Sequence, residues 1–389
     1  MALSKITDSM IPALTASKLT GALPAVDGSS LTGIADGITK NASDPAVNEN
    51  PAGGVGTIWA NTTSGEMYIL TDATAGANVW VNTGDGTDVE YITASGGTTT
   101  TYTATVDAID YKMHKFTSSG DFVISAGNGP NLKIDILVVA GGGGGGSGVN
   151  NASNGAGAGA GGLRWFTLKI PTQSTYAVTI GAGGSANTNG GVSSFIGTGI
   201  SISASGGGSG ATGNAVGSTG GSGGGGAGGL RAGGAGNTGS YTPAEGNAGG
   251  STPVNNVSGG GGGAGAVGGA GVSGVRAGFG GVGEDNLLDE GSVAFTQAAT
   301  TQMLTTASVG TLNSSVRYIG GGGTGGDDDS TTYPGGFGGG GSGGSSGATQ
   351  TGGAGTANTG GGGGGSTHAS SRVGGTGGSG VVLIRYQFQ

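Results

Sequence analysis

Apolar residues along the chain form short β-type runs, and two of these runs flank a long glycine-rich stretch. The most apolar run is Leu132–Ala140, which leads directly into Gly141–Gly146. A second run, Val381–Tyr386, follows the last glycines near the C-terminus. Short runs rich in Val, Ile and Leu that are bounded by glycine are typical of buried strands. We predict that Ile134–Ala140 and Val381–Tyr386 pair antiparallel and close the glycine-rich domain at its base.

Two small antiparallel β modules are predicted before the glycine-rich stretch, at 51–93 and 94–140. The first has the β-rich runs Thr57–Ala60, Glu66–Leu70 and Asn78–Val81, and the second has Tyr111–Phe116, Asp121–Ser125 and Leu132–Ala140. The aromatic residues of the first module suit a sugar-binding platform or a core. The core interpretation is favoured because so small a module has little else to bury. These residues are Trp59, Tyr68 and Trp80.

The segment 1–50 resembles a short attachment segment. Leu3, Ile6 and Met10 have helical spacing, but Pro12 interrupts the run and turn residues follow it. Fifty residues of this kind cannot bury a core alone, so we expect them to pack on a partner or on copies of themselves. No secretory signal and no run of about 20 apolar residues is visible, which predicts synthesis in a cytoplasm and no membrane insertion.

Composition narrows the class of protein. Glycine accounts for 101 of 389 residues, and only 16 of these glycines lie in 1–140. Nine prolines and the lack of a strict Gly-X-Y period exclude collagen. The absence of cysteine excludes disulfides and Cys-based metal sites. Only 9% of the residues are charged, and this scarcity of pocket-forming side chains argues against an enzyme. A pI near 4.5 argues against nucleic-acid binding.

Several segments resemble tail-fibre proteins of tailed bacteriophages, those of marine phages especially. The resemblance lies in "YKMHKFTSSGDFVISAGNGPNLKIDILVVAGGGGGG" at 111–146, "GGTGGSGVVLIRYQFQ" at 374–389, "LTASKLTGALPAVDGSSLTGI" and "GTIWANTTSGEMYILTDATAGANVWVNTGDG". In the related distal-tip adhesins, glycine-rich segments form a sandwich of polyglycine II helices, and loops at one end bind the host receptor. The resemblance therefore implies a mainly β and irregular fold, in which small β modules precede a polyglycine II receptor-binding domain at 141–389.

The physics of glycine is compatible with this fold. An extended threefold helix rises about 3.1 Å per residue and has no internal hydrogen bonds, so it persists only when neighbouring copies bond to each other. If each glycine block is one pass across the bundle, successive links alternate between the base and the far end. Entry and exit at the base require an even number of passes. We predict ten: 141–148, 155–162, 206–210, 218–229, 232–238, 257–270, 319–326, 335–346, 358–365 and 374–380.

This alternation assigns each link to one end. The predicted base links are 163–205, 230–231, 271–318 and 347–357, with Leu163–Ile170 and Thr175–Ile180 forming a hairpin through Pro171. The predicted far-end links are 149–154, 211–217, 239–256, 327–334 and 366–373. Candidate receptor-binding residues are those that the far-end links carry: Tyr241, Pro243, Asp327, Asp328, Asp329, Tyr333, His368 and Arg372. Tyr241, Tyr333 and Arg372 lead this set, because binding energy concentrates in aromatic and Arg residues.

Catalytic and metal motifs are weak. The Gly-x-Ser-x-Gly match at Gly220–Gly224 lacks the strand–turn–helix setting of a nucleophile elbow. His114 is expected to be an ordinary strand residue. The run Asp327–Asp329 either stays solvated or holds a cation such as Ca²⁺. No cofactor or metal is expected.

Three classes of function remain open. The favoured one is a non-catalytic phage tail fibre or fibre tip, located in the virion and made in the host cytoplasm. Its partners are a host cell-surface receptor, protein or polysaccharide, and other tail proteins, and a homotrimer is expected. The alternatives are a polysaccharide-degrading tailspike, for which Glu284 and Glu290 are the carboxylates that would pair, and a structural glycine-rich decoration protein.

Overall fold

The computed structural model of the chain divides into two compact units, Met1–Asp88 and Val89–Gln389. It describes residues 38–84, 91–127, 133–149, 153–170, 174–253, 257–287, 296–347, 350–368 and 372–388. Within these residues the fold is mainly β, with small antiparallel sheets and no closed barrel. Most of the predicted attachment segment, residues 1–37, lies outside the described residues.

The first unit is a four-stranded sheet in the order β1-β2-β3-β4. Its strands are β1 (Ile38–Asn41), β2 (Ile58–Asn61), β3 (Met67–Asp72) and β4 (Val79–Gly84). Strands β2, β3 and β4 form the predicted antiparallel meander, while β1 adds to β2 in parallel. The sheet therefore begins before residue 51, inside the segment that was predicted to serve attachment.

Trp59 is the centre of this small unit. Its side chain is 2% exposed, and its indole contacts that of Trp80 edge to face, with ring centroids 5.7 Å apart. The Trp59 Nε1 donates a hydrogen bond to the backbone oxygen of Ser43. The core interpretation is confirmed for Trp59, whereas Tyr68 and Trp80 are half-buried.

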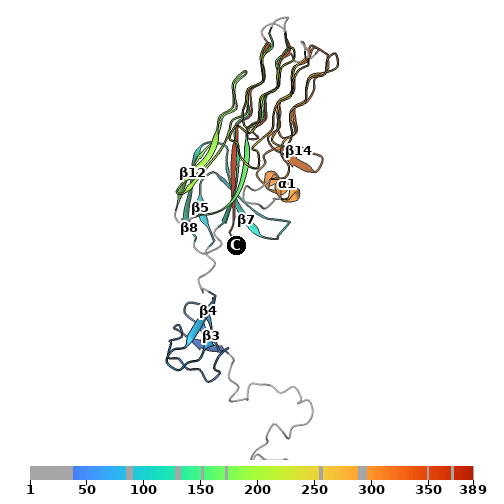
Figure 1. The fold of residues 1–389 in the computed structure, drawn as a ribbon. Helices are drawn as coiled ribbons and strands as arrows, with labels where there is room; N and C mark the ends of the chain where they lie inside the picture. Colours follow the sequence, from blue (N-terminus) through green and yellow to red (C-terminus); the bar gives the residue numbers. More distant parts are fainter. Residues whose placement is uncertain are drawn as a thin grey trace, which may run out of the picture. The chain divides into compact units, whose positions relative to one another are not determined.

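The second unit has two five-stranded sheets, which lie at one end of it (Figure 1). One has the order β10-β9-β16-β7-β6 and the other β13-β12-β11-β8-β5. The strands are β5 (Thr93–Ser95), β6 (Thr98–Thr103), β7 (Asp110–Phe116), β8 (Gly120–Ala126), β9 (Lys133–Val139), β10 (Leu163–Lys169), β11 (Thr175–Thr179), β12 (Ser193–Gly197), β13 (Ile200–Ala204) and β16 (Val381–Gln387). Strands of the predicted module 94–140 thus share sheets with much later ones.

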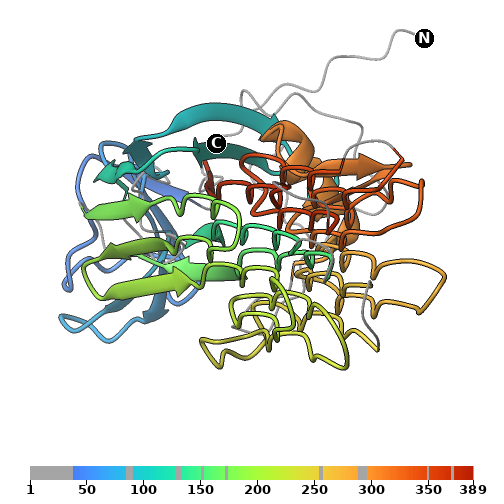
Figure 2. The ribbon, with the colours of Figure 1, turned by 90° about the horizontal axis from the view of Figure 1, so that it is seen from above.

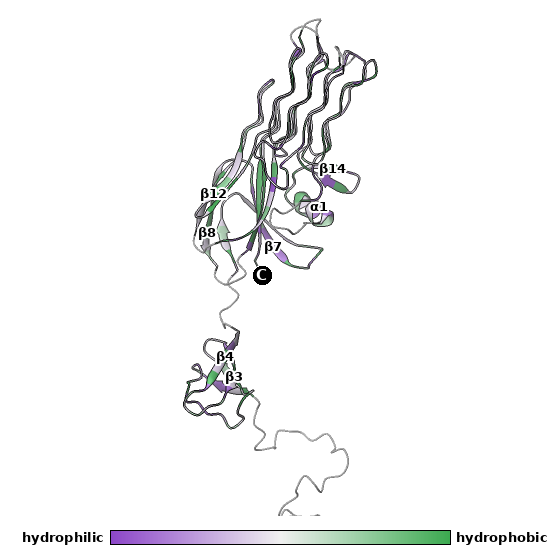
Figure 3. Ribbon diagram, in the orientation of Figure 1, coloured by the Kyte–Doolittle hydropathy of each residue, from purple (hydrophilic) through white to green (hydrophobic). Residues whose placement is uncertain are grey.

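Strand β9 is buried on both faces, which explains its nearly continuous apolar sequence. Ile134, Ile136 and Val138 belong to a core that also contains residues of both sheets, such as Phe122. Leu137 and Val139 belong to a second core, which includes residues of α1 (Gln297–Thr306). The hairpin of β14 (Thr311–Asn313) and β15 (Val316–Tyr318) lies next to this helix. Figure 3 shows these strands as the apolar part of the domain.

The predicted closure of the domain is confirmed. Strand β16 pairs antiparallel with β9, with Val381 opposite Val139 and Leu383 opposite Leu137. The predicted hairpin of 163–170 and 175–180 is wrong. Strand β10 pairs with β9 along its full length, whereas β11 pairs with β8 and β12 in the other sheet. The two strands therefore belong to different sheets.

The glycine-rich segments form extended passes whose hydrogen bonds repeat every third residue. The N–H groups of Gly141 and Gly144 donate to the segment 188–191, those of Gly142 and Gly145 to 375–378, and those of Gly143 and Gly146 to 156–159. A helix with three residues per turn directs successive N–H groups to three different neighbours in this way. The repeat is the one that the predicted polyglycine II helix requires.

The pass 155–162 lies at the centre of this lattice. It donates backbone hydrogen bonds to 360–366, 205–211 and 259–262, and it accepts them from 140–146, 222–225 and 323–326. It therefore has six neighbouring extended segments, which range along the chain from the preceding pass, 140–146, to 360–366. Figures 1 and 2 show these segments side by side, coloured from green to red.

The passes are shorter and more numerous than predicted. Hydrogen bonds between 218 and 224 and between 260 and 269 show that the chain reverses near Gly221 and near Gly265, inside two predicted passes. A further reversal near Gly338 divides the predicted pass 335–346. Glycine dominates these reversals as it does the passes around them, so the sequence does not distinguish one from the other.

Candidate binding face

The ends of the passes remote from the sheets form one face, which we call the far face. Next to β9 and β10, Ala140 bonds to Gly162, while Val149 and Ser153 form a bridge at the other end of the same two passes. The described residues of the far face are 148–149, 153–154, 212–215, 228–231, 272–276, 327–333, 345–347, 367–368 and 372.

Asp327, Asp328 and Asp329 form the hub of the far face because each carboxylate has a different partner. Asp327 is 5% exposed and accepts a hydrogen bond from the backbone N–H of Ala277. Asp329 accepts hydrogen bonds from the Tyr333 hydroxyl at 3.0 Å and from the Thr331 N–H at 2.7 Å. Separation of the three carboxylates limits their mutual repulsion, and burial raises the pKa of Asp327 above its usual value.

His368 ties three turns together. Its Nδ1 lies 2.6 Å from an oxygen of Asp328, and its backbone N–H donates to Asn154 Oδ1 at 2.7 Å. Asn154 is fully buried at the end of the pass 155–162. His368 therefore contacts Asp328 through its imidazole and Asn154 through its backbone N–H. The predicted far-end placement is confirmed for 327–334 and for the described residues of 366–373.

An aromatic and cationic cluster borders the same hub. The Phe279 and Tyr333 rings meet edge to face with centroids 5.4 Å apart, and the Arg276 guanidinium lies 4.2 Å from the Phe279 ring centroid. Tyr333 in turn donates to Asp329. Neither Arg276 nor Phe279 was a predicted site residue. The sequence analysis missed both residues because it assigned the whole segment 271–318 to the base.

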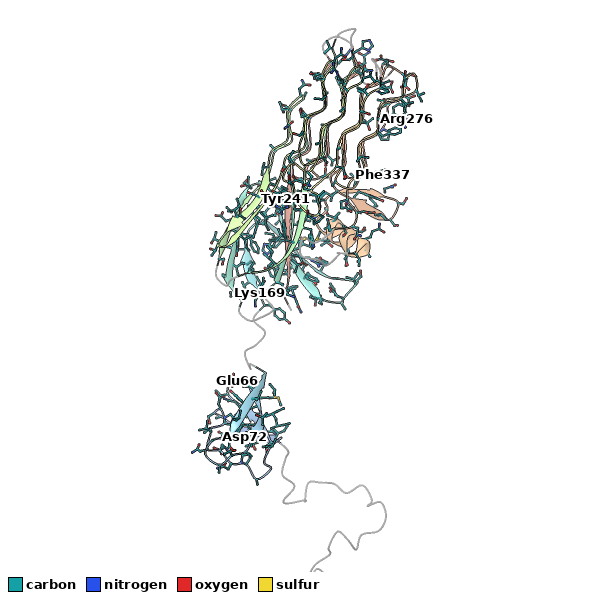
Figure 4. All side chains as sticks on the ribbon, viewed as in Figure 1. Glu66, Asp72, Lys169, Tyr241, Arg276 and Phe337 are labelled. Atoms are coloured by element: carbon teal, nitrogen blue, oxygen red, sulfur yellow. The ribbon has the colours of Figure 1, made fainter. Side chains whose placement is uncertain are left out.

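Tyr241 and Pro243 do not lie at the far end, and their predicted placement there is wrong. The Tyr241 ring covers the guanidinium of Arg164 in β10 at 3.5 Å, and Pro243 lines a small cavity with Leu163 and Trp165. Figure 4 places Tyr241 next to the sheets and Arg276 near the other end of the domain. The reversal near Gly221 moves the link 239–245 to the sheets.

The carboxylate of Glu245 holds this link against the sheets. It accepts hydrogen bonds from the N–H groups of Ser205 at 2.8 Å and Gly239 at 3.1 Å, while the Glu245 backbone oxygen accepts from Leu163. Glu245 is 1% exposed. Glu245 therefore has a structural role that the sequence did not reveal.

Parts of three links that were predicted to lie at the base, 230–231, 271–318 and 347–357, belong to the far face. In the third link, the Gln350 oxygen accepts a hydrogen bond from the Thr367 N–H, and the preceding Ser346 bonds to Asp329. The chain reverses near residue 229, where Gly224 and Gly234 bond to each other, and near residue 274, where Val272 and Arg276 bond to each other. These turns expose Leu230 and Val275, with 84% and 61% of their surface accessible. Arg372 and Val373, in the last far-face turn, are also exposed.

The described part of the chain has few candidate catalytic or metal-binding groups. No group of three or more His, Cys, Asp or Glu residues there is arranged to hold a metal ion. Burial raises the pKa of Glu284, which lines the same cavity as Glu245, while Glu290 lies outside the described residues. Among the helices of the described residues, none has the length and apolarity to span a membrane.

The comparison with protein families defines the class of this chain. Residues 116–387 match the glycine-rich domain family, which covers most of the second unit. The chain therefore belongs to this family. A comparison with curated proteins finds no match.

Proposed function

We propose that this chain is a tail fibre or fibre-tip protein of a tailed bacteriophage, which binds a host cell-surface receptor without catalysis. The proposal starts from the resemblance of four segments, among them 111–146 and 374–389, to phage fibre proteins. The match to a glycine-rich domain family supports the coarser part of it. We further propose that the extended passes are polyglycine II helices, which the three-residue repeat of their hydrogen bonds supports.

One observation carries the proposal: a rigid lattice holds chemically diverse turns on a single face. The central pass 155–162 is bonded to six neighbours, so its turn cannot move without breaking many hydrogen bonds together. The turns at its end carry Asp, His, Tyr and Arg side chains, which differ from the Gly, Ala and Ser of the passes. A structural decoration protein has no need for such diversity confined to one face.

The proposed receptor contacts follow from this geometry. They are Asp328, Asp329, Tyr333, His368 and Arg372 of the original set, with the buried Asp327 positioning the hub. Through the segment 1–50 the protein is proposed to join other tail proteins as a homotrimer. Its location is then the virion after synthesis in the host cytoplasm, and neither nucleic acid nor a membrane interior is its partner.

The proposal is tested by adsorption. The full-length protein, fluorescently labelled, is incubated with a panel of intact marine bacterial strains, and bound protein is measured by flow cytometry. Saturable binding to some strains and not to others is the expected result. Binding to no strain, or equal binding to all strains and to bare beads, contradicts it. Release of sugar from purified host polysaccharide would instead support the tailspike alternative.

A further inference from the structure

Leu230 is held in a backbone conformation that favours glycine. Its φ angle is 49°, in the left-handed region, where a bulky side chain is a rare outlier. Glycines surround it, since Gly228 and Gly229 precede it and a quarter of the whole chain is glycine. The leucine side chain is 84% exposed, the most exposed large apolar side chain in the described part of the second unit. Because the strained backbone holds a side chain that is mostly exposed, we look for its partner outside the chain.

The turn at 272–276 repeats this chemistry. Leu230 is followed by Arg231, and Val275 is followed by Arg276, so each turn presents an aliphatic side chain beside a guanidinium. The two turns flank the end of one pass, because Arg231 bridges to Thr252 and Gly271 bonds to Ser251. They therefore belong to one continuous surface, which we call the Leu–Arg surface: 228–231 and 272–276.

The charges of this surface lack acidic partners. Neither Arg231 nor Arg276 forms an ion pair with any residue that the structure describes. The acidic groups of the neighbouring hub are already engaged, Asp327 by Ala277, Asp328 by His368 and Asp329 by Tyr333. The surface thus offers apolar side chains and two guanidinium groups without an acidic partner among the described residues.

We propose that the Leu–Arg surface binds a protein, at a site where an exposed apolar patch lies beside acidic side chains. This inference rests on the proposed function and names the class of its receptor as protein instead of polysaccharide. Aliphatic side chains next to Arg suit an apolar protein patch with carboxylates at its rim, since Arg is enriched in such interfaces. Sugars pack on aromatic faces, which the Leu–Arg surface lacks apart from the Phe279 ring that Arg276 covers.

The first test uses Leu230→Gly. Glycine relieves the backbone strain, so the thermal midpoint should stay equal or rise, whereas binding to cells should fall at least tenfold. The matched control is Leu312→Ser, at an exposed leucine of the β14–β15 hairpin beside the sheets, which should leave binding unchanged. Wild-type binding by the Leu230→Gly variant overturns the proposal.

The second test identifies the receptor class. Full-length protein is bound to intact cells of an adsorbing strain, to cells treated with protease, and to cells treated with periodate. We expect protease to abolish binding and periodate to spare it. Arg231→Glu with Arg276→Glu should also abolish binding, while Lys133→Glu, at an exposed position in β9, should not. Raising NaCl from about 50 to about 500 mM should weaken the binding of wild type, because exposed charges are screened.

The outcomes separate the two proposals. Binding that survives protease but not periodate overturns the protein receptor and leaves the adsorption function intact. Absence of binding to every strain overturns both.

Discussion

Val381 of β16 lies opposite Val139 of β9, so the strand that leaves the glycine-rich lattice pairs with the strand that enters it. The lattice is thereby closed at the sheets, and the chain ends its last pass at the edge where it began the first. Its turns at the other end depend on the passes for their position, and the passes depend on backbone hydrogen bonds instead of side-chain packing. The predictions below test this arrangement part by part.

Gly159 and Ala158 test the lattice at neighbouring positions of the central pass. A Cβ on Gly159 would lie 2.1 Å from the backbone oxygen of Ser222, which cannot retreat without breaking the next pass. Gly159→Ala should therefore destabilise the protein by more than about 2 kcal/mol. Ala158→Gly introduces no clash and should cost about 1 kcal/mol through chain entropy. Thermal unfolding measures both, and equal losses would contradict the lattice.

Tyr333 and Tyr241 test the location of the receptor site. Tyr333→Ala should reduce adsorption at least tenfold, equivalent to about 1.4 kcal/mol, and loss of its contacts with Phe279 and Asp329 should also lower thermal stability. Tyr241→Ala should lower stability, because the Tyr241 ring covers Arg164, and should leave adsorption unchanged. The opposite result in both variants would place the receptor site at the sheets.

His114 makes the stability depend on pH. It is fully buried in β7, with its ring nitrogens hydrogen-bonded to the Gly96 oxygen and the Tyr386 hydroxyl, and burial lowers its pKa below the usual 6.5. The unfolded chain therefore binds a proton that the folded chain rejects. The contribution of His114 is complete above about pH 6.5 and falls as the pH drops toward its folded pKa.

Thermal midpoints of wild type and His114→Gln, measured from about pH 8 to about pH 5, check this expectation. Glutamine can keep a hydrogen bond but does not titrate in this range. The difference between the two proteins should shrink as the pH falls. A difference in thermal midpoint that is constant across this pH range would show that His114 does not contribute to the pH dependence of stability.

Two truncations test the attachment segment. Removal of 1–37 should leave a folded protein that no longer joins tail proteins. Removal of 1–50 deletes β1 and the Ser43 oxygen that accepts the Trp59 hydrogen bond, so the first unit should also lose stability. Tryptophan fluorescence during unfolding distinguishes the two fragments. If the variant that lacks 1–37 still assembles into virions, the attachment site lies outside these residues.

The sequence alone determined the features that depend on local pattern and composition. The apolar run at 134–140 is continuous because β9 is buried on both faces, and this made its pairing with Val381–Tyr386 predictable. Glycine content indicated a lattice of close backbones. The turns at 327–334 and 366–373 were placed correctly because an even number of reversals was missed before them. Each missed reversal inverts the direction assigned to the later passes, so an even number restores it.

Only the tertiary structure decided where the glycine passes reverse and what their turns contact. A reversal at Gly221 has the same residues as the pass around it, so the error at this point misplaced Tyr241 and hid Leu230. The division of Asp327, Asp328 and Asp329 among three partners depends on segments far away in the sequence, such as Ala277 and His368. Glycine lacks a side chain to specify its neighbours. Their identity is therefore set by the simultaneous satisfaction of backbone hydrogen bonds across the whole lattice.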